Sequence, residues 1–458
     1  MKRRDFLKLS GILGAGASFS LPSMQVFGAV DNYTGPLWLI INADGGWDPT
    51  SLFDPKGYTD PADPNRLNNY PSSSIIQAPN NSPLRYAPPP DSFLTNTTLY
   101  NAKTFYDKYY QKMLVFNGVD TRTNSHEDGQ RHSWSGEMSR LGFPSIGALI
   151  AGVAAPARPM SYITNGGYAN TGGLTVASRM KSYDLAPLYE VAYPNRSQDA
   201  SSSGSQSYFP EGVTAARSLI KAASDARTQS LYDAQRLLRL KETLGKLRES
   251  RSGPSSFAAM TNNLATNIRS RTQASFPGRY VAYELYDQGH IALAAYQSGV
   301  AAAVQLEIGG FDTHSNHDAT HYPRLMDLLS GLDAILSEAE TRGLADKLVV
   351  IVGSDFGRTN IYNADNGKDH WPITSMMVMG NSAQTIRGNR VIGATTATHN
   401  AMWINPTTLA AVPANTAGAV RLTPGVIHQS LRRLAGVDTA LAATTTFPLT
   451  VPALSLFA

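Results

Sequence analysis

Short apolar runs, spaced widely along the chain, carry the clearest structural signal in this sequence. Near-continuous apolar residues occupy positions 37–41, 113–116, 303–306, 348–352 and 376–379. Runs of this length and composition are typical of strands that are buried on both faces. The segment 322–342 instead has the spacing of one helix face, with Leu325, Leu328, Leu329, Leu332 and Leu336. Strands alternating with helices predict an α/β fold, in which a mostly parallel central sheet is flanked by helices.

Two stretches break this alternation. Residues 54–98 are crowded with Pro, Asn and Ser, which predicts a long ordered loop. Residues 165–285 contain a Ser-rich tract at 200–207 and then helix-forming sequence with many Lys and Arg. We interpret 165–285 as a largely helical insertion or cap within a single domain that covers 30–458. Its basic face either binds an anionic partner or is simply a solvated helix surface.

The first thirty residues have the order of an export signal. Paired arginines at Arg3-Arg4 are followed by an apolar stretch at about 9–21 and by small residues around Gly28-Ala29. This order is typical of a twin-arginine signal peptide, which we assign to 1–29. The alternative is a basic, flexible N-terminus. Export would make the twin-arginine translocase a partner and the periplasm or the cell exterior the final location.

Charge and cysteine content exclude several function classes. The signal holds four basic residues and one acidic residue, so it carries three of the four net positive charges and leaves about +1 on the mature protein. This balance gives no indication of nucleic-acid binding. The chain has no cysteine, which excludes disulfides, sulfur-ligated metals and a thiol nucleophile. The apolar stretch of the signal is too short for a stable membrane span, and no second stretch approaches the roughly 20 residues required.

Three of the predicted strands end on an aspartate beside glycine. They are Asp44 in Ala43-Asp44-Gly45-Gly46, Asp312 in Gly309-Gly310-Phe311-Asp312, and Asp355 in Gly353-Ser354-Asp355. Ligands of open α/β sheets bind at this carboxyl edge. A single aspartate there is usually a helix cap or turn former. Three together favour a cation site, because carboxylates held close repel one another unless a cation lies among them.

Histidines accompany these acidic segments. Those in or beside them are His126, His132, His314, His317, His321 and His370. Carboxylate and imidazole ligands without thiolate suit Zn²⁺, Mn²⁺ or another divalent ion. The alternative for any one of these histidines is an ordinary structural or surface role.

Several of these motifs together resemble a known family. The twin-arginine start, Gly45-Gly46-Trp47-Asp48, Gly310-Phe311-Asp312-Thr313-His314, Ser354-Asp355-Phe356-Gly357-Arg358-Thr359 and Asp369-His370-Trp371-Pro372 are similar to the exported proteins called domain of unknown function 1501. That family is similar to the alkaline phosphatase and sulfatase superfamily. The resemblance covers most of the mature chain and implies an alkaline-phosphatase-like fold with one or two divalent ions at the strand ends.

The resemblance also implies a ligand set. Asp44 would match the metal aspartate after the first strand. Asp312, with His314 or His317, would match the second ligand group, and His370 the late histidine. The superfamily commonly has an Asp-His pair after the third strand. Here Phe356 follows Asp355 and the pair occurs at Asp369-His370, so either Asp355 or Asp369 is the ligand.

The nucleophile is less clearly marked. The resemblance implies Ser, Thr or a formylglycine at a helix start, which points to Ser125 in the segment 121–128. The alternative is that Ser125 and Asp128 form a variant capping box, and His126 could itself be a metal ligand. Arylsulfatases have Cys or Ser followed by x-Pro-x-Arg. The stretches Asn81-Ser82-Pro83-Leu84-Arg85 and Ala154-Ala155-Pro156-Ala157-Arg158 begin with neither residue, which argues against a formylglycine at either place.

Two functions remain open from the sequence. The first is an exported metal-dependent hydrolase of phosphate or sulfate esters. In it a metal-activated Ser125 hydroxyl or water attacks, and Arg358 and Arg122 clamp the anionic group. The second is a non-catalytic exported binding protein with a structural or degenerate metal site. A phosphomutase-like isomerase is disfavoured by export.

Overall fold

The computed structural model describes residues 32–87, 100, 102–181, 185–193, 214–237, 254–264, 280–380 and 386–457, with isolated positions between 240 and 247. The predicted signal peptide at 1–29 lies outside these residues.

An eight-stranded sheet forms the centre of the protein. Its strand order is β12 (Arg390–Ile392), β4 (Met113–Asp120), β11 (Ile373–Gly380), β8 (Leu348–Ser354), β1 (Leu37–Ala43), β7 (Ala303–Ile308), β5 (Tyr162–Thr164) and β6 (Ala177–Ser178). Only β11 runs antiparallel to its two neighbours, β4 and β8. The prediction of a mostly parallel sheet is therefore confirmed, and all five predicted apolar runs are strands of it.

The register of the three central strands aligns their carboxyl ends. Ala43, the last residue of β1, pairs with Ser354 at the end of β8 and with Ile308 at the end of β7. Asp44 and Asp355 directly follow two of these aligned residues. The chain segments after the three strands therefore leave the sheet side by side at one edge.

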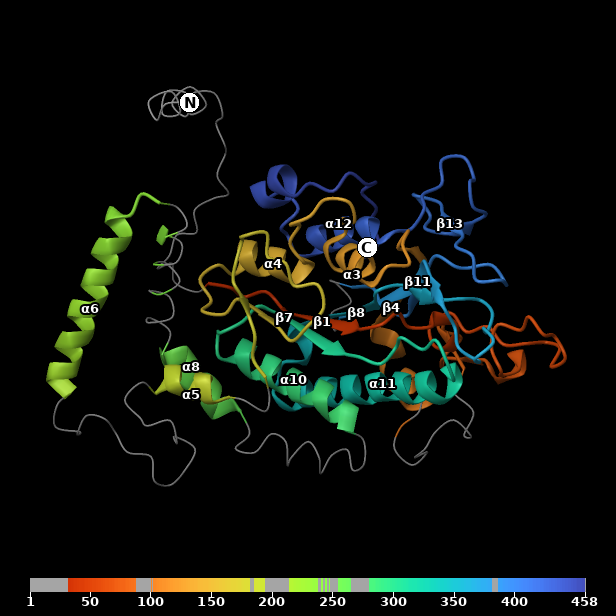
Figure 1. The fold of residues 1–458 in the computed structure, drawn as a ribbon, viewed down its shortest axis with the longest axis horizontal. Helices are drawn as coiled ribbons and strands as arrows, with labels where there is room; N and C mark the ends of the chain where they lie inside the picture. The colour runs from red at the N-terminus through yellow and green to blue at the C-terminus, as the bar shows by residue number, and fades with distance from the viewer. Residues whose placement is uncertain are drawn as a thin grey trace.

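Helices cover both faces of the sheet (Figure 1). One face packs against α2 (Ala102–Tyr109), α10 (Tyr280–Gln297) and α11 (His317–Thr341). The other face packs against α3 (His126–Ser135), α4 (Ile146–Ala154) and α12 (Pro424–Leu434). Alternate residues of β1 enter the two cores: Leu39 and Ile41 lie in the first, Trp38 and Ile40 in the second. This two-sided burial explains why the strands read as unbroken apolar runs.

The main crossover helix begins earlier than the apolar spacing predicts. Instead of starting at 322, α11 starts at His317, directly after Asn316, whose φ of 44° is left-handed. Pro323 lies within the second turn, where its missing N–H costs the helix one hydrogen bond. The early start matters for the site because it separates His314, in the preceding loop, from His317.

Shorter elements complete the chain. They are β2 (Ile76–Gln77), β3 (Arg85–Tyr86), β9 (Gly357–Arg358), β10 (His370–Trp371), β13 (Trp403–Ile404), β14 (Ala411–Val412), α5 (Ala186–Ala192), α6 (Thr214–Ala234) and α8 (Pro254–Asn263). One-turn helices occur at Pro49–Ser51, Ser72–Ser74, Tyr110–Lys112, Ala345–Lys347 and Ala442–Thr446. Most of the described part of the predicted 54–98 loop, 54–87, lacks regular structure, as expected.

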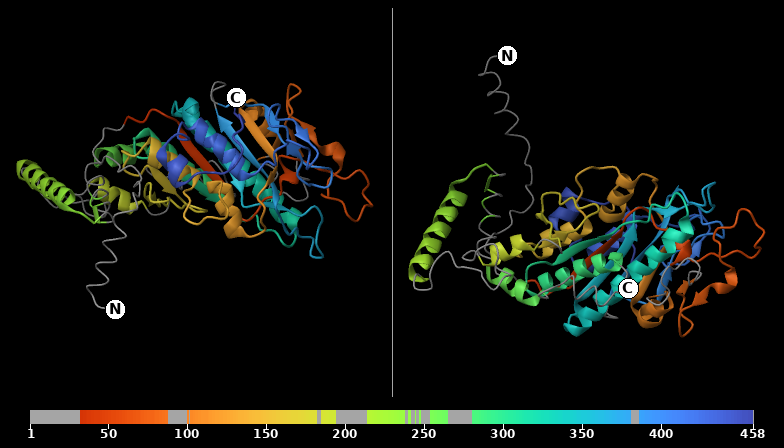
Figure 2. Two further views of the ribbon diagram at one scale, coloured as in Figure 1. Left: turned by 90° about the horizontal axis from the view of Figure 1, so that it is seen from above. Right: turned by 60° about the horizontal axis from the view of Figure 1, so that its bottom comes forward.

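The predicted insertion at 165–285 is only partly described. Its first part does not leave the domain, because β6 pairs with β5 at the sheet edge. Helices α5 and α8 pack on each other, and α8 also contacts α10. In all views, α6 lies at the end of the molecule away from the 54–87 loop (Figures 1 and 2). A cap over the strand ends stays a prediction. No described helix is both long and apolar enough to cross a membrane.

Candidate metal centre

The aspartates after β1 and β8 meet beneath the amino end of α3. Asp355 is fully buried, and its Oδ2 accepts hydrogen bonds from the Gly45 backbone N–H (3.3 Å) and from His126 Nδ1 (2.7 Å). Burial and the nearby charge of Asp355 raise the pKa of Asp44, whose Oδ1 accepts a 2.5 Å hydrogen bond from Gln130. The Asp355 carboxylate therefore lies close enough to Asp44 to oppose the ionisation of Asp44.

Glycine permits this close approach. Gly45 has a φ of +116°, and a Cβ there would lie 2.5 Å from the backbone nitrogen of Asp312. Any side chain at this position would push the turn after β1 away from the turn after β7. The glycine thus brings Asp312 toward Asp44 and Asp355.

Three histidines face Asp312 and form with it what we call the open cluster: His126, Asp312, His314 and His370. Asp312 Oδ1 lies 3.0 Å from His314 Nε2 and 3.2 Å from His370 Nε2. Asp312 Oδ2 lies 3.6 Å from His126 Nε2, and the two Nε2 atoms of His314 and His370 are 3.0 Å apart. Ligand atoms of His126, Asp312 and His370 all lie within 4.8 Å of one another, a separation that one metal ion can bridge.

Each imidazole of the open cluster is held from behind through its Nδ1 atom. His126 contacts Asp355 Oδ2, His314 contacts Asp369 Oδ1 (2.7 Å), and His370 donates to the carbonyl oxygen of Asn124 (2.7 Å). Because a carbonyl can only accept, neutral His370 carries its proton on Nδ1 and presents Nε2 as a free lone pair. Metal-ligating histidines are oriented in this way by outer acceptors.

The donor set fits a divalent cation. Asp355 Oδ1 is buried and has no hydrogen-bond partner among the described residues. A buried carboxylate oxygen without a partner is costly unless a cation or another donor compensates it. Imidazole nitrogens and carboxylate oxygens are the ligands that Zn²⁺ and Mn²⁺ accept.

Arg358, predicted as a substrate clamp, is fully buried and bonded within the protein. Its Nε donates to the Gly46 carbonyl (2.6 Å) and its Nη1 to the Lys368 carbonyl (3.0 Å). Its Nη2 donates to the Gly45 carbonyl and to Asp312 Oδ1 (2.7 Å). Partial burial alone would raise the pKa of Asp312, but the Arg358 guanidinium lowers this pKa below its usual value. Arg358 therefore fixes the turn after β1 and the position of Asp312.

Ser125 lies immediately before α3, next to His126. The side chain is exposed and makes no capping hydrogen bond, so the predicted capping box with Asp128 is absent. Asp128 pairs instead with Arg131 at 3.0 Å. The hydroxyl of Ser125, one residue before His126, thus makes no capping hydrogen bond.

Arg122 is not among the residues that contact the open cluster. It has a left-handed φ of 61° and is exposed. Its side chain lines a cavity of about 390 Å³ that it shares with His132, Glu137 and Arg421, and no residue of the open cluster lines this cavity.

A second group of polar side chains lies buried next to the first, and we call it the buried cluster: Asp48, His317, His321 and Lys368. Asp48 Oδ2 accepts from Lys368 Nζ (2.6 Å) and lies 3.3 Å from His317 Nε2. His321 Nε2 accepts from the Asp48 backbone N–H (2.9 Å). Although burial alone would raise the pKa of Asp48, Lys368 and His317 hold it well below its usual range. His317, a predicted metal ligand, therefore lies in this cluster.

Sequence reasoning assigned no role to Lys368 or Asp48, and it counted His321 only among the histidines beside the acidic segments. Asp48 belongs to the recognised Gly45-Gly46-Trp47-Asp48 motif, and His321 follows His317 by one helical turn, a spacing that predicts a shared helix face. Nothing local distinguishes Lys368 from a surface lysine.

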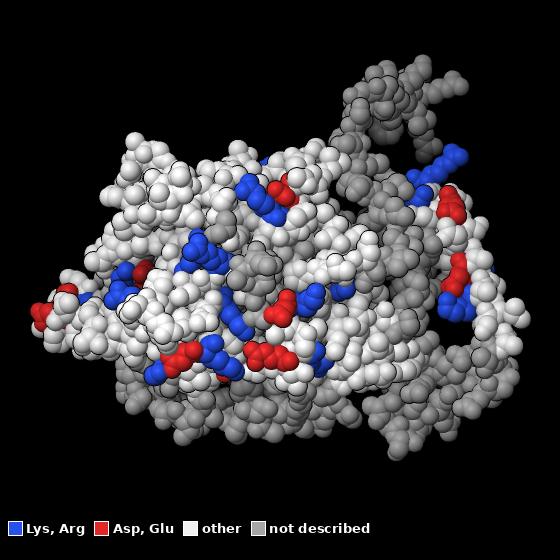
Figure 3. Space-filling view, turned by 180° about the vertical axis from the view of Figure 1, so that it is seen from behind, with Lys and Arg blue, Asp and Glu red and all other residues white. Residues whose placement is uncertain are grey.

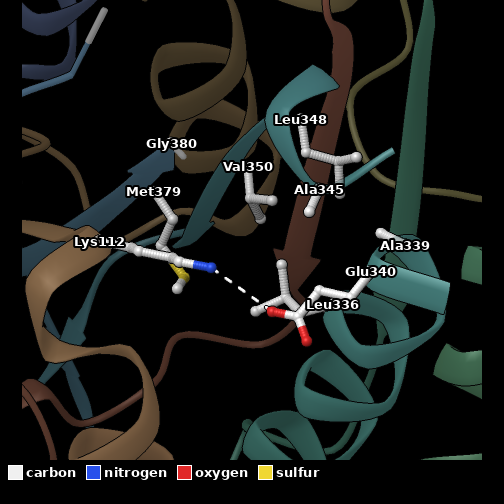
Figure 4. A pocket seen from close by; sticks show the side chains of 9 residues that line it. All are labelled: Lys112, Leu336, Ala339, Glu340, Ala345, Leu348, Val350, Met379 and Gly380. Carbon is white, nitrogen blue, oxygen red and sulfur yellow. Dashed lines mark ion pairs between the residues drawn. The ribbon is translucent and has the colours of Figure 1, made fainter. Parts of the chain in front are cut away.

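Two other surface features are less suited to binding a ligand. A hollow of about 20 Å³ lies at the amino end of β8, lined by Leu348, Val350 and Met379, and an ion pair between Lys112 and Glu340 (3.5 Å) crosses it (Figure 4). It has room for little more than one water molecule. On the face shown in Figure 3, the basic and acidic side chains of the described residues are interspersed, and these residues form no broad basic patch there.

Comparison with solved structures gives several distant similarities. The chain is similar to the lipoteichoic acid synthase LtaP from Listeria monocytogenes, with 7% identity, 93% of this chain and 76% of that chain covered, and a TM-score of 0.38. It is similar to PsFucS1 sulfatase from Pseudoalteromonas sp., with 9% identity, coverage of 88% and 68%, and a TM-score of 0.34. It is also similar to a variant of TAB5 alkaline phosphatase with Mg bound, with 10% identity, coverage of 78% and 94%, and a TM-score of 0.32.

Comparison of the sequence with protein families identifies the family of this chain. No curated protein sequence matches the chain. A family profile, however, matches residues 38–424, which contain all of the central sheet except its residue Leu37, and both clusters. The chain belongs to the family described as protein of unknown function (DUF1501).

Proposed function

We propose that this protein is an exported metal-dependent hydrolase of phosphate or sulfate esters. The observation that carries the proposal is the open cluster. Three imidazole Nε2 atoms face one carboxylate, and each ring is held through Nδ1 by an outer acceptor. The anionic ester class follows from the sequence resemblance to the alkaline phosphatase and sulfatase superfamily.

In this proposal one divalent ion, Zn²⁺ or Mn²⁺, is held by His126, Asp312, His314 and His370. Asp369 orients His314 rather than binding the ion, since its Oδ1 contacts His314 Nδ1. Asp44 and the free Oδ1 of Asp355 would suit a second ion. A bound ion supplies Lewis acidity, which polarises the ester and lowers the pKa of a hydroxyl or water.

The protein's own groups have separable tasks. The Ser125 hydroxyl is the candidate nucleophile, because it lies beside His126 and has no capping role. The amino end of α3 favours negative charge next to Ser125 through its unpaired N–H groups and helix dipole. Arg358 holds Asp312 in position from a fully buried place. A metal-bound water is the alternative nucleophile.

The second candidate is a non-catalytic exported binding protein with a structural metal site. One observation favours it: Arg358 already gives Asp312 a positive partner without any metal. Exposure argues the other way. The side chains of His126, Asp312 and His314 are 38%, 47% and 47% exposed. Catalytic sites keep an open position of this kind, whereas structural sites are closed.

Export is part of the proposal. The paired arginines and apolar stretch of 1–29 support recognition by the twin-arginine translocase and a periplasmic or extracellular location. The arginine pair provides the test: replacing Arg3 and Arg4 by Lys should leave the full-length precursor in the cytoplasm.

The decisive experiment measures metal content and ester hydrolysis together. We expect purified protein to contain zinc or manganese near stoichiometry and to hydrolyse 4-nitrophenyl phosphate or 4-nitrophenyl sulfate. His370→Ala should lose both metal and activity, whereas Ser125→Ala should keep the metal and lose activity. The control is Asp365→Asn, an exposed carboxylate in the loop before His370. Stoichiometric metal without hydrolysis of any ester would support the binding protein, and absence of metal would overturn both candidates.

A further inference from the structure

A cavity on the α3 side of the sheet is distinct from the open cluster. It lies between Arg122 in the segment before α3, the end of α3 with the residues up to 139, the segment before α12 and the residues at 449–452. Its volume of about 390 Å³ is within the range of small-molecule sites. Polar side chains that line it include Arg122, His132, Glu137, Arg421 and Thr423.

The positive charge of this cavity is only partly balanced. The Arg122 side chain has no ion pair or hydrogen bond to any described residue. Arg421 pairs through Nη2 with Asp120, yet its side chain is 44% exposed. The carboxylate of Glu137 is already bound by Arg140 at 2.7 Å. The cavity therefore presents an unpaired guanidinium to any anion that enters it.

Arg122 is well suited to bind such an anion. A guanidinium offers paired donors that match the oxygens of sulfate, phosphate or carboxylate. The positive φ of Arg122 is an unusual backbone conformation for a non-glycine residue. Its backbone N–H donates to Asp120 Oδ1 (2.7 Å), which fixes the turn from which the side chain extends.

A short segment connects the cavity to the open cluster. The Thr121 carbonyl accepts from His132, which lines the cavity, whereas the Asn124 carbonyl accepts from His370 of the open cluster. His126 follows Arg122 by four residues, so the two Cα atoms are at most about 14 Å apart. One extended molecule can therefore reach both places.

We propose that this cavity is a second anion subsite, which binds a sulfate or phosphate group of the substrate remote from the ester that is hydrolysed. The inference rests on the proposed hydrolase function and narrows its substrate class. The substrate is an extended ester with at least two negative groups, one at the open cluster and one beside Arg122. Simple monoesters would occupy only half of the site.

The first test measures binding without catalysis. Naphthalene-1,5-disulfonate is the probe, because sulfonates are not esters and cannot be hydrolysed. The protein is treated with EDTA, so that a metal ion in the open cluster cannot bind the probe. Calorimetric titration should give saturable binding, about tenfold weaker in Arg122→Gln and in Arg421→Gln. Arg122→Lys should lie between them and the unmodified protein, since it keeps the charge but loses the paired donors.

The matched control is Arg85→Gln, which removes an exposed arginine from β3 in the loop region after β1. Its affinity should stay within twofold of the unmodified protein. Equal affinities for Arg122→Gln and Arg85→Gln, or no binding of the probe at millimolar concentration, would overturn the subsite. Thermal unfolding of each variant establishes that a loss of binding does not come from loss of the fold.

The second test separates this inference from the proposed function. With a bis-sulfate or bis-phosphate ester, Arg122→Gln should raise KM about tenfold and leave kcat unchanged, while KM for 4-nitrophenyl monoesters should not move. If the probe binds in an Arg122-dependent way but the protein hydrolyses no ester, the hydrolase proposal is refuted and the anion site is retained. If the protein hydrolyses bis-esters and Arg122→Gln does not change the KM, the subsite alone is refuted.

Discussion

Two stretches of the sequence contribute residues to both the open cluster and the buried cluster. The turn after β1 places Asp44 beside the open cluster and Asp48 in the buried cluster. The stretch after β7 gives His314 to the first and His317 to the second. Lys368 and His370 are separated by one residue and also divide between the two. Both clusters combine carboxylates with imidazoles, and they differ in what balances the negative charge.

The buried cluster contains its own cation. The Lys368 ammonium lies 2.6 Å from Asp48 and 2.8 Å from the Asn68 side-chain oxygen, with both members of the ion pair fully buried. In the open cluster, Arg358 pairs with Asp312. Burial and the charge of Asp355 raise the pKa of the neighbouring Asp44 carboxyl. The buried cluster thus has a fully buried ammonium as the partner of its carboxylate, whereas the Asp44 carboxyl beside the open cluster has no such partner among the described residues.

The largest effect should come from removing the internal cation. Lys368→Met leaves the Asp48 carboxylate buried without its partner, which costs about 3–5 kcal/mol of unfolding free energy. Urea denaturation measures the loss. The double variant Asp48→Asn with Lys368→Met should recover much of it, because neither charge is then left alone. Lys103→Met, at an exposed lysine of α2, should change stability by less than about 1 kcal/mol. If Lys368→Met were as stable as Lys103→Met, the lysine would not be the charge partner that distinguishes the buried cluster from the open cluster.

A smaller effect is expected from an outer partner of the open cluster. Asp369→Asn weakens the acceptor that holds His314 through Nδ1, which should lower metal affinity about 10–100-fold. Competition with a chromophoric chelator measures the affinity. Because Asp369 is exposed, the unfolding free energy of the metal-free protein should barely change. Asp365→Asn in the same loop is the matched control, and equal affinities for the two variants would remove Asp369 from the metal centre.

The smallest effect concerns the pH dependence of the buried cluster. Burial holds the pKa of His321 well below its usual range, so the folded protein keeps the ring neutral while the unfolded chain binds a proton near pH 6.5. Stability is therefore full above about pH 6.5 and falls as the pH drops below it. The slope is at most about 1.4 kcal/mol per pH unit for one histidine.

His321→Gln tests this slope while its amide oxygen can still accept from the Asp48 N–H. Unfolding free energies of metal-free protein between pH 7 and pH 5 should fall less steeply in the variant than in the unmodified protein. Parallel curves would show that His321 does not contribute to the acid sensitivity.

The sequence predicts the sheet well for a simple physical reason. Strands buried on both faces must be apolar along their whole length, and the five predicted runs are the five strands at the centre of the sheet. The edge strands β5, β6 and β12 are two or three residues long and leave no such pattern. The aspartates at the strand ends were predictable because the carboxyl ends of parallel strands align.

The division of residues between the two clusters was not predictable. His314 and His317 stand three residues apart, and which one faces Asp312 depends on where α11 begins. The helix starts after Asn316, whose backbone has a left-handed conformation. Several residue types can adopt this conformation, so the sequence does not mark the start. Lys368 acquires its role only through contacts with Asp48 and Asn68, more than 290 residues earlier in the chain. Contacts over such separations leave no periodic signal.

The antiparallel strand of the central sheet, β11, has a consequence for the order of events during biosynthesis. β11 lies between β4 and β8, and His370 directly precedes it. A nascent chain that has emerged only as far as β8 possesses β1, β4 and β7 but has an unfilled position in the middle of its sheet. His314 and His126 then have neither His370 nor Asp369 opposite them. Under the proposed function, metal loading should therefore follow synthesis of almost the entire domain, so that truncated chains stay metal-free.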